Sequence, residues 1–348
     1  MALSEQARSF FKGKSVLVTG GCGSIGGQVV EEILKLEPKV VRVFSRDEGK
    51  HFDMQERLGN RKDIRYLVGD VRDRRRLNTA MKGIDVVFHA AAMKHVPACE
   101  YNPFEAVQTN VIGTQNVIQM AAERELPHLV AISTDKAMTP VNTMGASKLL
   151  AEKLVASADA WNPKTTMSCV RFGNVVGSRG SVVPAMIRSI VTQREVRITE
   201  PDMTRFMMTI QDAVHLTLNS CVDAEGGEIF IFKMPSLKLN DLVDVVIEET
   251  CRREKMSPTM IKRVIIGIRP GEKMHEGLFS EEELSRTEER RDTFVVHSMD
   301  EFLRRERKGW GDVDTAQLLS DKCKLLNKDE IKQLLDRAHV WDHIRRVV

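Results

Sequence analysis

Residues 19–26 read Thr-Gly-Gly-Cys-Gly-Ser-Ile-Gly, and this stretch decides the fold. A short apolar segment at 14–18 predicts a buried strand before it, and an amphipathic pattern after it predicts a helix. In such a unit Gly20 permits the tight turn, Gly23 lets backbone amides approach a pyrophosphate, and Gly26 lets the helix pack on the strand. The helix N-terminus then faces the phosphates. The sequence therefore predicts a dinucleotide-binding turn.

Further apolar segments alternate with helical patterns as far as residue 174. Strands are predicted at 40–44, 64–68, 86–90 and 129–132, and the clearest helix at 103–125. Regular alternation of this kind is typical of an α/β fold with a doubly wound parallel sheet. We therefore expect a Rossmann-type sheet that binds its ligands where the strands end.

The pattern loosens in the second half of the chain, which indicates a smaller substrate-binding lobe. The predicted parts are a dinucleotide-binding domain at 1–174, a return to it at 205–235, a substrate-binding lobe at 175–204 and 236–290, and a charged C-terminal segment at 291–348.

Two helices in this half have recognisable starts. Asn240 is the expected N-cap of a helix near 237–246. Asn327 and Glu330 have the spacing of a capping box, which predicts a last helix through Leu335. Its many charges indicate a solvated surface helix.

Residues at the ends of the second, third and fourth strands suit a nucleotide cofactor. Ser45 and Arg46 follow the second strand, where an NAD-binding fold offers an acidic residue to the ribose 2′-hydroxyl. A guanidinium beside a hydroxyl suits a 2′-phosphate, so we expect NADP, with NAD as the alternative if Asp47 points inward. The predicted cofactor contacts are Gly20, Gly23, Ser24, Ile25, Gly26, Ser45, Arg46, Asp70, Val71, Ala90 and Ala91.

The fifth predicted strand runs into Ser133-Thr134-Asp135-Lys136, which places an acid and a base where open α/β sheets bind ligands. The next helix carries Met144 and Lys148, which are four residues apart and share one face. A site that only moved hydride would not need both an acid and a base. The segment therefore predicts proton-transfer chemistry beside a nicotinamide-type cofactor.

Composition excludes several classes of function. The 348 residues carry a net charge of +3 with both signs mixed, so nothing indicates binding to nucleic acid or to an anionic membrane. No apolar stretch approaches the roughly 20 residues of a membrane span, and no signal-peptide pattern opens the chain, so a cytoplasmic protein is expected. The six cysteines lack metal-ligand spacing, so we predict small buried cysteines and no metal site. His89 is expected to be a satisfied core histidine.

Six motifs in chain order resemble the extended short-chain dehydrogenase/reductases, and specifically the nucleotide-sugar 4,6-dehydratases of polysaccharide and flagellin-glycan biosynthesis. The resemblance spans about residues 12–293. The motifs occupy 45–48, 91–97, 133–137, 171–184, 202–209 and 269–276.

This resemblance implies a UDP-N-acetylglucosamine substrate and a tightly held nicotinamide cofactor that is regenerated in each turnover. Oxidation at C4 of the sugar would acidify the C5 proton, water would leave across C5 and C6, and the hydride would return to C6. The implied roles are Asp135 as acid, Lys136 as C5 base, Thr134 as partner of the 4-hydroxyl and Lys148 as anchor of the nicotinamide ribose. The implied substrate contacts are Lys94, Asn174, Val182, Arg205, Arg269 and Glu272, with the two arginines on the diphosphate.

Met144 departs from the superfamily pattern, which has a tyrosine at that position. The departure removes the phenol that normally takes the 4-hydroxyl proton, and it leaves Asp135 acting through Thr134, or a water, as candidate bases.

Two alternatives to a dehydratase are a nucleotide-sugar 4-epimerase and a catalytically silent binding or scaffold protein. Asp135 and Lys136 favour the dehydratase, inversion at C5 is weakly preferred over retention, and a homo-oligomer is expected.

Overall fold

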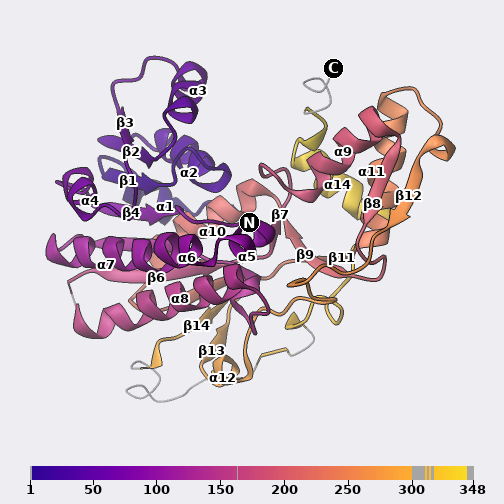
Figure 1. Cartoon of the computed structure of the whole chain (residues 1–348). Coiled ribbons are helices and arrows are strands. Elements are labelled where there is room, and N and C mark those ends of the chain that lie inside the picture. The colour runs from indigo at the N-terminus through magenta and orange to yellow at the C-terminus, as the bar shows by residue number, and fades with distance from the viewer. Residues whose placement is uncertain (1, 163, 300–309, 312, 315–316, 343–348) are drawn as a thin grey trace. The chain divides into compact units, whose positions relative to one another are not determined.

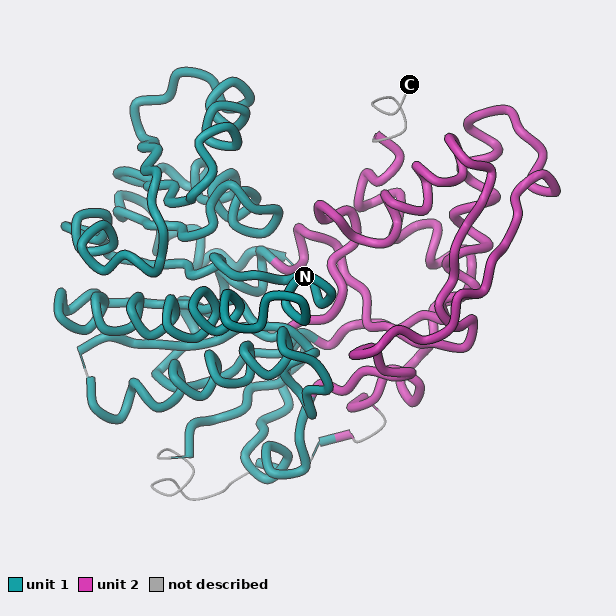
Figure 2. Tube along the Cα trace, in the orientation of Figure 1, with its two compact units in different colours: residues 1–171, 214–232, 279–313 teal, residues 172–213, 233–278, 314–348 magenta. Residues whose placement is uncertain are grey.

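The computed structural model describes residues 2–162, 164–299, 310–311, 313–314 and 317–342 (Figure 1). The chain forms two compact units, each built from three segments (Figure 2). Unit 1 comprises 1–171, 214–232 and 279–313, and unit 2 comprises 172–213, 233–278 and 314–348.

Unit 1 is built on a nine-stranded sheet in the order β13-β14-β10-β6-β5-β4-β1-β2-β3. Strands β3 to β10 in that order pair in parallel, and β14 and β13 add an antiparallel edge. Because β1 pairs with both β2 and β4, the strand order reverses there, which is where doubly wound sheets bind ligands. The strands are β1 Ser15–Thr19, β2 Val40–Ser45, β3 Ile64–Val68, β4 Val86–His89, β5 His128–Ile132, β6 Thr166–Arg171, β10 Ile229–Phe232, β13 Thr287–Glu289 and β14 Thr293–Val296.

Helices cover this sheet and fill its crossovers, as the predicted alternation requires. They are α1 Glu5–Phe11, α2 Ser24–Leu34, α3 Glu48–Leu58, α4 Arg74–Ala80, α5 Val96–Tyr101, α6 Pro103–Ala106, the π-helical segment η1 Val107–Ile112, α7 Gly113–Glu123, the short 3₁₀ turn η2 Asp135–Ala137, α8 Thr143–Trp161, α10 Ile210–Asp223 and α12 Glu281–Leu284. The fold class predicted from the sequence is confirmed. Each of the five predicted strands differs from the observed one by at most one residue at either end.

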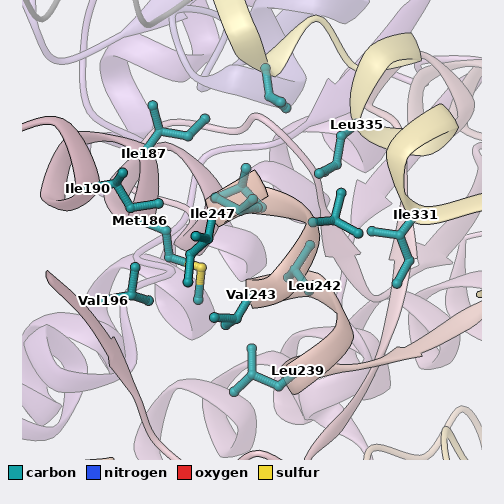
Figure 3. Packing of buried hydrophobic residues seen from close by; sticks show 14 of the residues in the cluster. Met186, Ile187, Ile190, Val196, Leu239, Leu242, Val243, Ile247, Ile331 and Leu335 are labelled. Carbon is teal, nitrogen blue, oxygen red and sulfur yellow. The ribbon is translucent and has the colours of Figure 1, made fainter. Parts of the chain in front are cut away.

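Unit 2 has two small sheets and its own apolar core. One sheet has the order β11-β9-β7, and the other pairs β12 with β8 in parallel. Side chains from α9, α11 and α14 form the core, where Ile187, Val243 and Ile331 are fully buried (Figure 3). The elements are β7 Asn174–Val175, α9 Val182–Gln193, β8 Glu195–Ile198, β9 Thr204–Met208, β11 Ser236–Lys238, α11 Leu239–Arg253, η3 Pro258–Met260, β12 Lys262–Ile265 and α14 Lys328–Arg337.

The structure corrects two predictions for the second half. Lys238, not Asn240, is the N-cap of α11, because the Asn240 amide donates to the Pro201 carbonyl at 3.1 Å and helix has already begun. The capping box of α14 is present, but the helix is not merely a solvated surface helix, since it buries Ile331 and two leucines. The predicted charged C-terminal segment contains β14, whose four residues are buried in the unit 1 sheet.

Cysteine burial agrees with the sequence except at one position. Five of the six free cysteines are buried, whereas Cys323 is half-buried.

Candidate active site

The glycine-rich turn between β1 and α2 is closely packed. Gly20 has a φ of 66°, and a Cβ there would lie 2.7 Å from the Ala90 backbone, so this position requires glycine. A Cβ on Gly26 would overlap the Gly20 carbonyl oxygen. Gly23 is the N-cap of α2, and no side chain caps the helix there. The first turn, with Ser24 and Ile25, therefore offers backbone amides to an anionic group.

The ends of β2 and β3 are joined by an exposed ion-pair network. The Arg46 guanidinium lies 3.7 Å from Asp70, and Asp70 also pairs with Arg72 at 2.7 Å. Asp47 accepts a hydrogen bond from the Lys50 amide at 3.1 Å and is the N-cap of α3. Its carboxylate is therefore already used locally, while Arg46 is more than half exposed.

His89 is a satisfied core histidine, as predicted, and its protonation state follows from its partners. Thr114 Oγ1 donates to the Asn110 carbonyl at 2.6 Å, so it accepts from His89 Nε2 at 3.0 Å. The other ring nitrogen, Nδ1, then accepts from Thr19 Oγ1 at 2.7 Å. Burial, reinforced by the Lys148 charge, lowers the pKa of His89 to about 3. The neutral imidazole therefore ties β1 and β4 to α7.

Asn110 is a buried site residue that the sequence analysis missed. Its side-chain oxygen accepts from the Met93 amide at 2.7 Å, and its Nδ2 donates to the Met93 carbonyl at 3.0 Å and to Ser147 Oγ at 2.9 Å. Ser147 in turn donates to the Met144 carbonyl at 2.8 Å. Asn110 lies in η1, and π-helical segments are frequent at functional sites. An amide on an otherwise apolar helix face was the available signal.

The acid and base predicted after β5 pair a buried carboxylate with a partly exposed lysine. Lys136 Nζ lies 2.9 Å from Asp135 Oδ1, and Thr134 Oγ1 donates to the same oxygen at 3.0 Å. Asp135 is fully buried, and its Oδ2 has no hydrogen-bond partner among the described residues. Ser133 Oγ is also buried without a partner in this set. Unsatisfied buried oxygens are costly and are expected where a ligand supplies the missing hydrogen bond.

Lys148 lies on α8, which packs against η2. Its ammonium donates to the Ile132 carbonyl at 2.7 Å, at the end of β5. Burial lowers the pKa of Lys148 to about 8, while Cys169 and Glu152 oppose that shift. Burial also raises the pKa of Cys169, so the thiol stays neutral and the carboxylate supplies the opposing charge.

Met144 and Gly145 at the start of α8 have packing roles. Met144 is buried in a hydrophobic cluster with Cys99 and Ala106. A Cβ on Gly145 would overlap the Lys136 carbonyl oxygen. Glycine at 145 therefore lets α8 approach the turn that carries the acid–base pair.

The predicted substrate residues fall into three environments. Lys94 is exposed in the loop after β4 of unit 1. In unit 2, the Arg205 guanidinium donates to the carbonyls of Thr204, Met274 and Lys273 at 2.7–3.0 Å, so it holds the 273–276 segment. Arg269 is exposed, and its guanidinium makes no hydrogen bond or ion pair to another described residue.

The other predicted substrate residues, Glu272, Asn174 and Val182, also lie in unit 2. The Glu272 amide donates to the Arg269 carbonyl at 3.0 Å, which closes a turn. Asn174 is half-buried on β7, and Val182 is partly exposed as the first residue of α9. The residues predicted for the cofactor and for catalysis thus lie in unit 1, and all predicted substrate contacts except Lys94 lie in unit 2.

Comparison with known proteins places this site in a family. Residues 16–298 match the polysaccharide biosynthesis protein family. The chain belongs to this family. A relative from Methanocaldococcus jannaschii, named an uncharacterized membrane protein, is 50% identical over 330 residues, which is 94% of this chain and 96% of that protein. In the described residues, no helix has the length and apolarity needed to cross a bilayer.

Other relatives of the chain include two kinds of named enzyme. A UDP-N-acetylglucosamine 4,6-dehydratase (inverting) from Campylobacter jejuni is 43% identical over 291 residues, covering 82% of this chain and 83% of the relative. A UDP-glucose 4-epimerase from Rickettsia conorii is 38% identical over 335 residues, covering 93% and 96%. The solved structure of Pen from Bacillus thuringiensis matches with a TM-score of 0.88 at 43% identity, covering 95% and 99%.

Proposed function

We propose that this protein is an inverting UDP-N-acetylglucosamine 4,6-dehydratase. The observation that carries the proposal is the pairing of the buried Asp135 with the partly exposed Lys136 after β5, with Lys148 on the helix packed against this turn. Removal of water from the sugar needs both an acid and a base, and this pair supplies them. A hydride transfer alone would not need both. The similarity to the Campylobacter jejuni dehydratase supports the substrate and the inversion at C5.

Unit 1 fits a nicotinamide dinucleotide. Gly20 and Gly26 leave no room for side chains, and the uncapped start of α2 suits a pyrophosphate. Arg46 with Ser45 favours NADP over NAD, because Asp47 is already engaged as a helix cap. A bound nicotinamide would accept hydride from C4 of the sugar and return it to C6. Lys148 would hold its ribose.

Asp135 receives the first proton in this scheme. The methionine at 144 cannot take the 4-hydroxyl proton, but Thr134 Oγ1 already donates to Asp135 at 3.0 Å. When the 4-hydroxyl gives its proton to Thr134, Thr134 passes its own proton to Asp135. The relay leaves a neutral carboxylic acid, which is the form that can later protonate the 6-hydroxyl.

Lys136 becomes a base as a consequence. Once Asp135 is neutral, the ammonium has lost its counter-charge and gives its proton to solvent, which reaches the 24% of its side chain that is exposed. The neutral amine removes the C5 proton while Asp135 protonates the 6-hydroxyl, which leaves as water. The pair returns to its ionic form. Inversion requires that the new C5 proton arrive from solvent on the face opposite Lys136.

Unit 2 supplies the candidates for nucleotide recognition. Arg269 has an exposed guanidinium without a protein partner in the described residues, so we assign it to the diphosphate. Arg205 supports this role by holding the neighbouring 273–276 segment through three carbonyls. Asn174, Val182 and Glu272 are assigned to the nucleotide-sugar contacts of this unit, and Lys94 of unit 1 to the sugar.

NMR of the reaction products tests the proposal. The protein should convert UDP-N-acetylglucosamine to a 4-keto-6-deoxy product with a new C6 methyl signal. A 4-epimerase is the second candidate because the Rickettsia conorii relative carries that name. Epimerisation of UDP-glucose or UDP-N-acetylglucosamine without a methyl signal would replace the dehydratase proposal, and no turnover of either would support a binding protein.

Cofactor identity has its own test. Nucleotide released from the denatured protein should be NADP, and Arg46→Asp should shift the binding preference toward NAD. Arg72→Ala is the matched control, because Arg72 also pairs with Asp70 but follows the third strand. Recovery of NAD alone would overturn the NADP assignment while leaving the dehydratase proposal intact.

A further inference from the structure

A chain of alternating charges runs through the interior of unit 1. Arg171, at the end of β6, is fully buried and donates to both oxygens of Glu152 on α8 at 3.0 and 2.6 Å. The same guanidinium donates to both oxygens of Glu283 on α12 at 3.0 and 2.9 Å. Arg286 extends the chain beyond Glu283, which it affects electrostatically. Lys148 stands at the other end, one helical turn before Glu152.

The two carboxylates and one guanidinium of this triad sum to one negative charge, which Arg286 offsets in part on the Glu283 side. Glu152 and Glu283 are both nearly completely buried, so little water screens that charge. The arrangement leaves Glu152 only partly neutralised, because Arg171 divides its hydrogen bonds between two carboxylates. The negative potential of Glu152 acts on Lys148, which lies four residues earlier on α8.

The other groups around Lys148 do not supply a negative charge. His89 on β4 is neutral, and burial raises the pKa of the Cys169 thiol on β6. Asp135 and Lys136 of η2 pair with each other at 2.9 Å. Glu152 is thus the acidic side chain that acts on Lys148 among the described residues.

We propose that Glu152 is a positioning residue for Lys148, and that Arg171 and Glu283 hold it as the counter-charge that keeps the ammonium protonated on the Ile132 carbonyl. The inference deepens the proposed function and rests on it, because it concerns the lysine assigned to the cofactor ribose. Without Glu152, the burial that already lowers the pKa of Lys148 to about 8 would act unopposed. The lysine would then lose its proton at a lower pH.

Glu283 provides a matched control within the triad. Glu152→Gln and Glu283→Gln each remove one buried carboxylate that accepts two hydrogen bonds from Arg171. Glu283→Gln also alters the acceptor of the Ser280 amide in the capping box of α12, so it should disturb folding at least as much as Glu152→Gln. They differ at Lys148, because only Glu152 acts on that lysine directly.

Competitive acetylation across a pH series, read by mass spectrometry, measures the titration of individual lysines. Glu152→Gln should move the midpoint of Lys148 down by about one pH unit, which is the lower range for loss of a nearby opposite charge. Glu283→Gln should move it by less than half as much. The exposed Lys153 on the same helix should keep its midpoint in both variants and serves as internal control.

An unchanged Lys148 midpoint in Glu152→Gln, or equal shifts in the two variants, would overturn the proposal. If Glu152→Gln does not fold, Glu152→Asp keeps the charge and should keep the wild-type midpoint. A fall of about one unit in that variant would equally contradict the assignment. The labelling needs no UDP-sugar, so its result is separate from any failure to find dehydratase activity.

Discussion

Asp135 in unit 1 and Arg269 in unit 2 are ionisable residues that differ in burial and in the number of their protein partners. Asp135 is fully buried, and Thr134 and Lys136 hold one of its oxygens through hydrogen bonds. Arg269 is exposed, and no described side chain holds its guanidinium. A group that transfers protons benefits from fixed partners and low dielectric, whereas a group that captures a diphosphate must be free to receive it. We therefore expect changes in unit 1 to affect turnover and changes in unit 2 to affect affinity.

Asp135→Asn should cause the largest loss. The amide keeps the shape of the side chain but cannot donate the proton that the 6-hydroxyl needs, so kcat should fall by about 10³-fold. Product formation at saturating substrate gives kcat, and calorimetric titration should show nearly unchanged UDP-sugar binding. A variant that turns over at more than a tenth of the wild-type rate would remove Asp135 from the acid role.

Gly145→Ala should displace the Asp135–Lys136 pair without changing either functional group. The new Cβ would overlap the Lys136 carbonyl, so we expect a loss of about 1–3 kcal/mol in unfolding free energy and a clear fall in kcat. Gly49→Ala on α3 is the control, because a Cβ there meets only Asp47 at an ordinary 3.5 Å. Equal behaviour of the two variants in denaturant unfolding and turnover would show that close packing at 145 is unimportant.

Arg269→Ala tests whether a change in unit 2 affects substrate affinity rather than turnover. Loss of a charge-assisted contact to the diphosphate should raise KM about 10- to 100-fold with little change in kcat. Arg188→Ala removes another exposed arginine of unit 2 and should leave both constants unchanged. Steady-state kinetics decides, and a fall in kcat at constant KM would move Arg269 from binding to chemistry.

The neutral His89 should make stability depend on pH. Its folded pKa of about 3 lies below the ordinary value of 6.5, so the unfolded state binds more protons between these limits. Unfolding free energy should fall by up to about 1.4 kcal/mol per unit as pH drops below 6.5. The difference between wild type and His89→Gln in denaturant unfolding isolates this slope, and parallel curves from pH 7 to pH 4 would contradict it.

Met144→Leu should have the smallest effect. The side chain packs with Cys99 and Ala106 and is assigned no proton, so a nearly volume-conserving change should cost less than about 1.5 kcal/mol. Turnover should remain within a few-fold of wild type. A folded, cofactor-loaded variant as inactive as Asp135→Asn would mean that the C4 step depends on this position.

Local patterns were enough to predict the strands and the glycine turn. Each of these is encoded in neighbouring residues, through apolar runs and glycine spacing, so the sequence carries the signal. The satisfied state of His89 followed from its apolar strand in the same way. The start of α11 was misplaced because the extended backbone through Lys238 is fixed by pairing with β9, which propensity at Asn240 does not report.

Contacts between distant residues could not be predicted in this way. Asn110 lies on a π-helical segment and reaches Ser147, 37 residues away. Arg171 and Glu283 are separated by 112 residues. The engagement of Arg205 with three carbonyls likewise depends on the path of the 273–276 segment. Such partners are chosen by the folded chain, and a single sequence shows only that polar residues are present.

The role of the Asp135–Lys136 pair is tested most directly by running the reaction in D₂O with wild type and Lys136→Ala. The wild-type 4-keto-6-deoxy product should carry one deuterium at C5, because Lys136 removes that proton and solvent replaces it. Folded, cofactor-loaded Lys136→Ala should form no product and exchange no C5 proton. Wild-type product that retains its C5 hydrogen, or normal turnover by Lys136→Ala, would contradict the account.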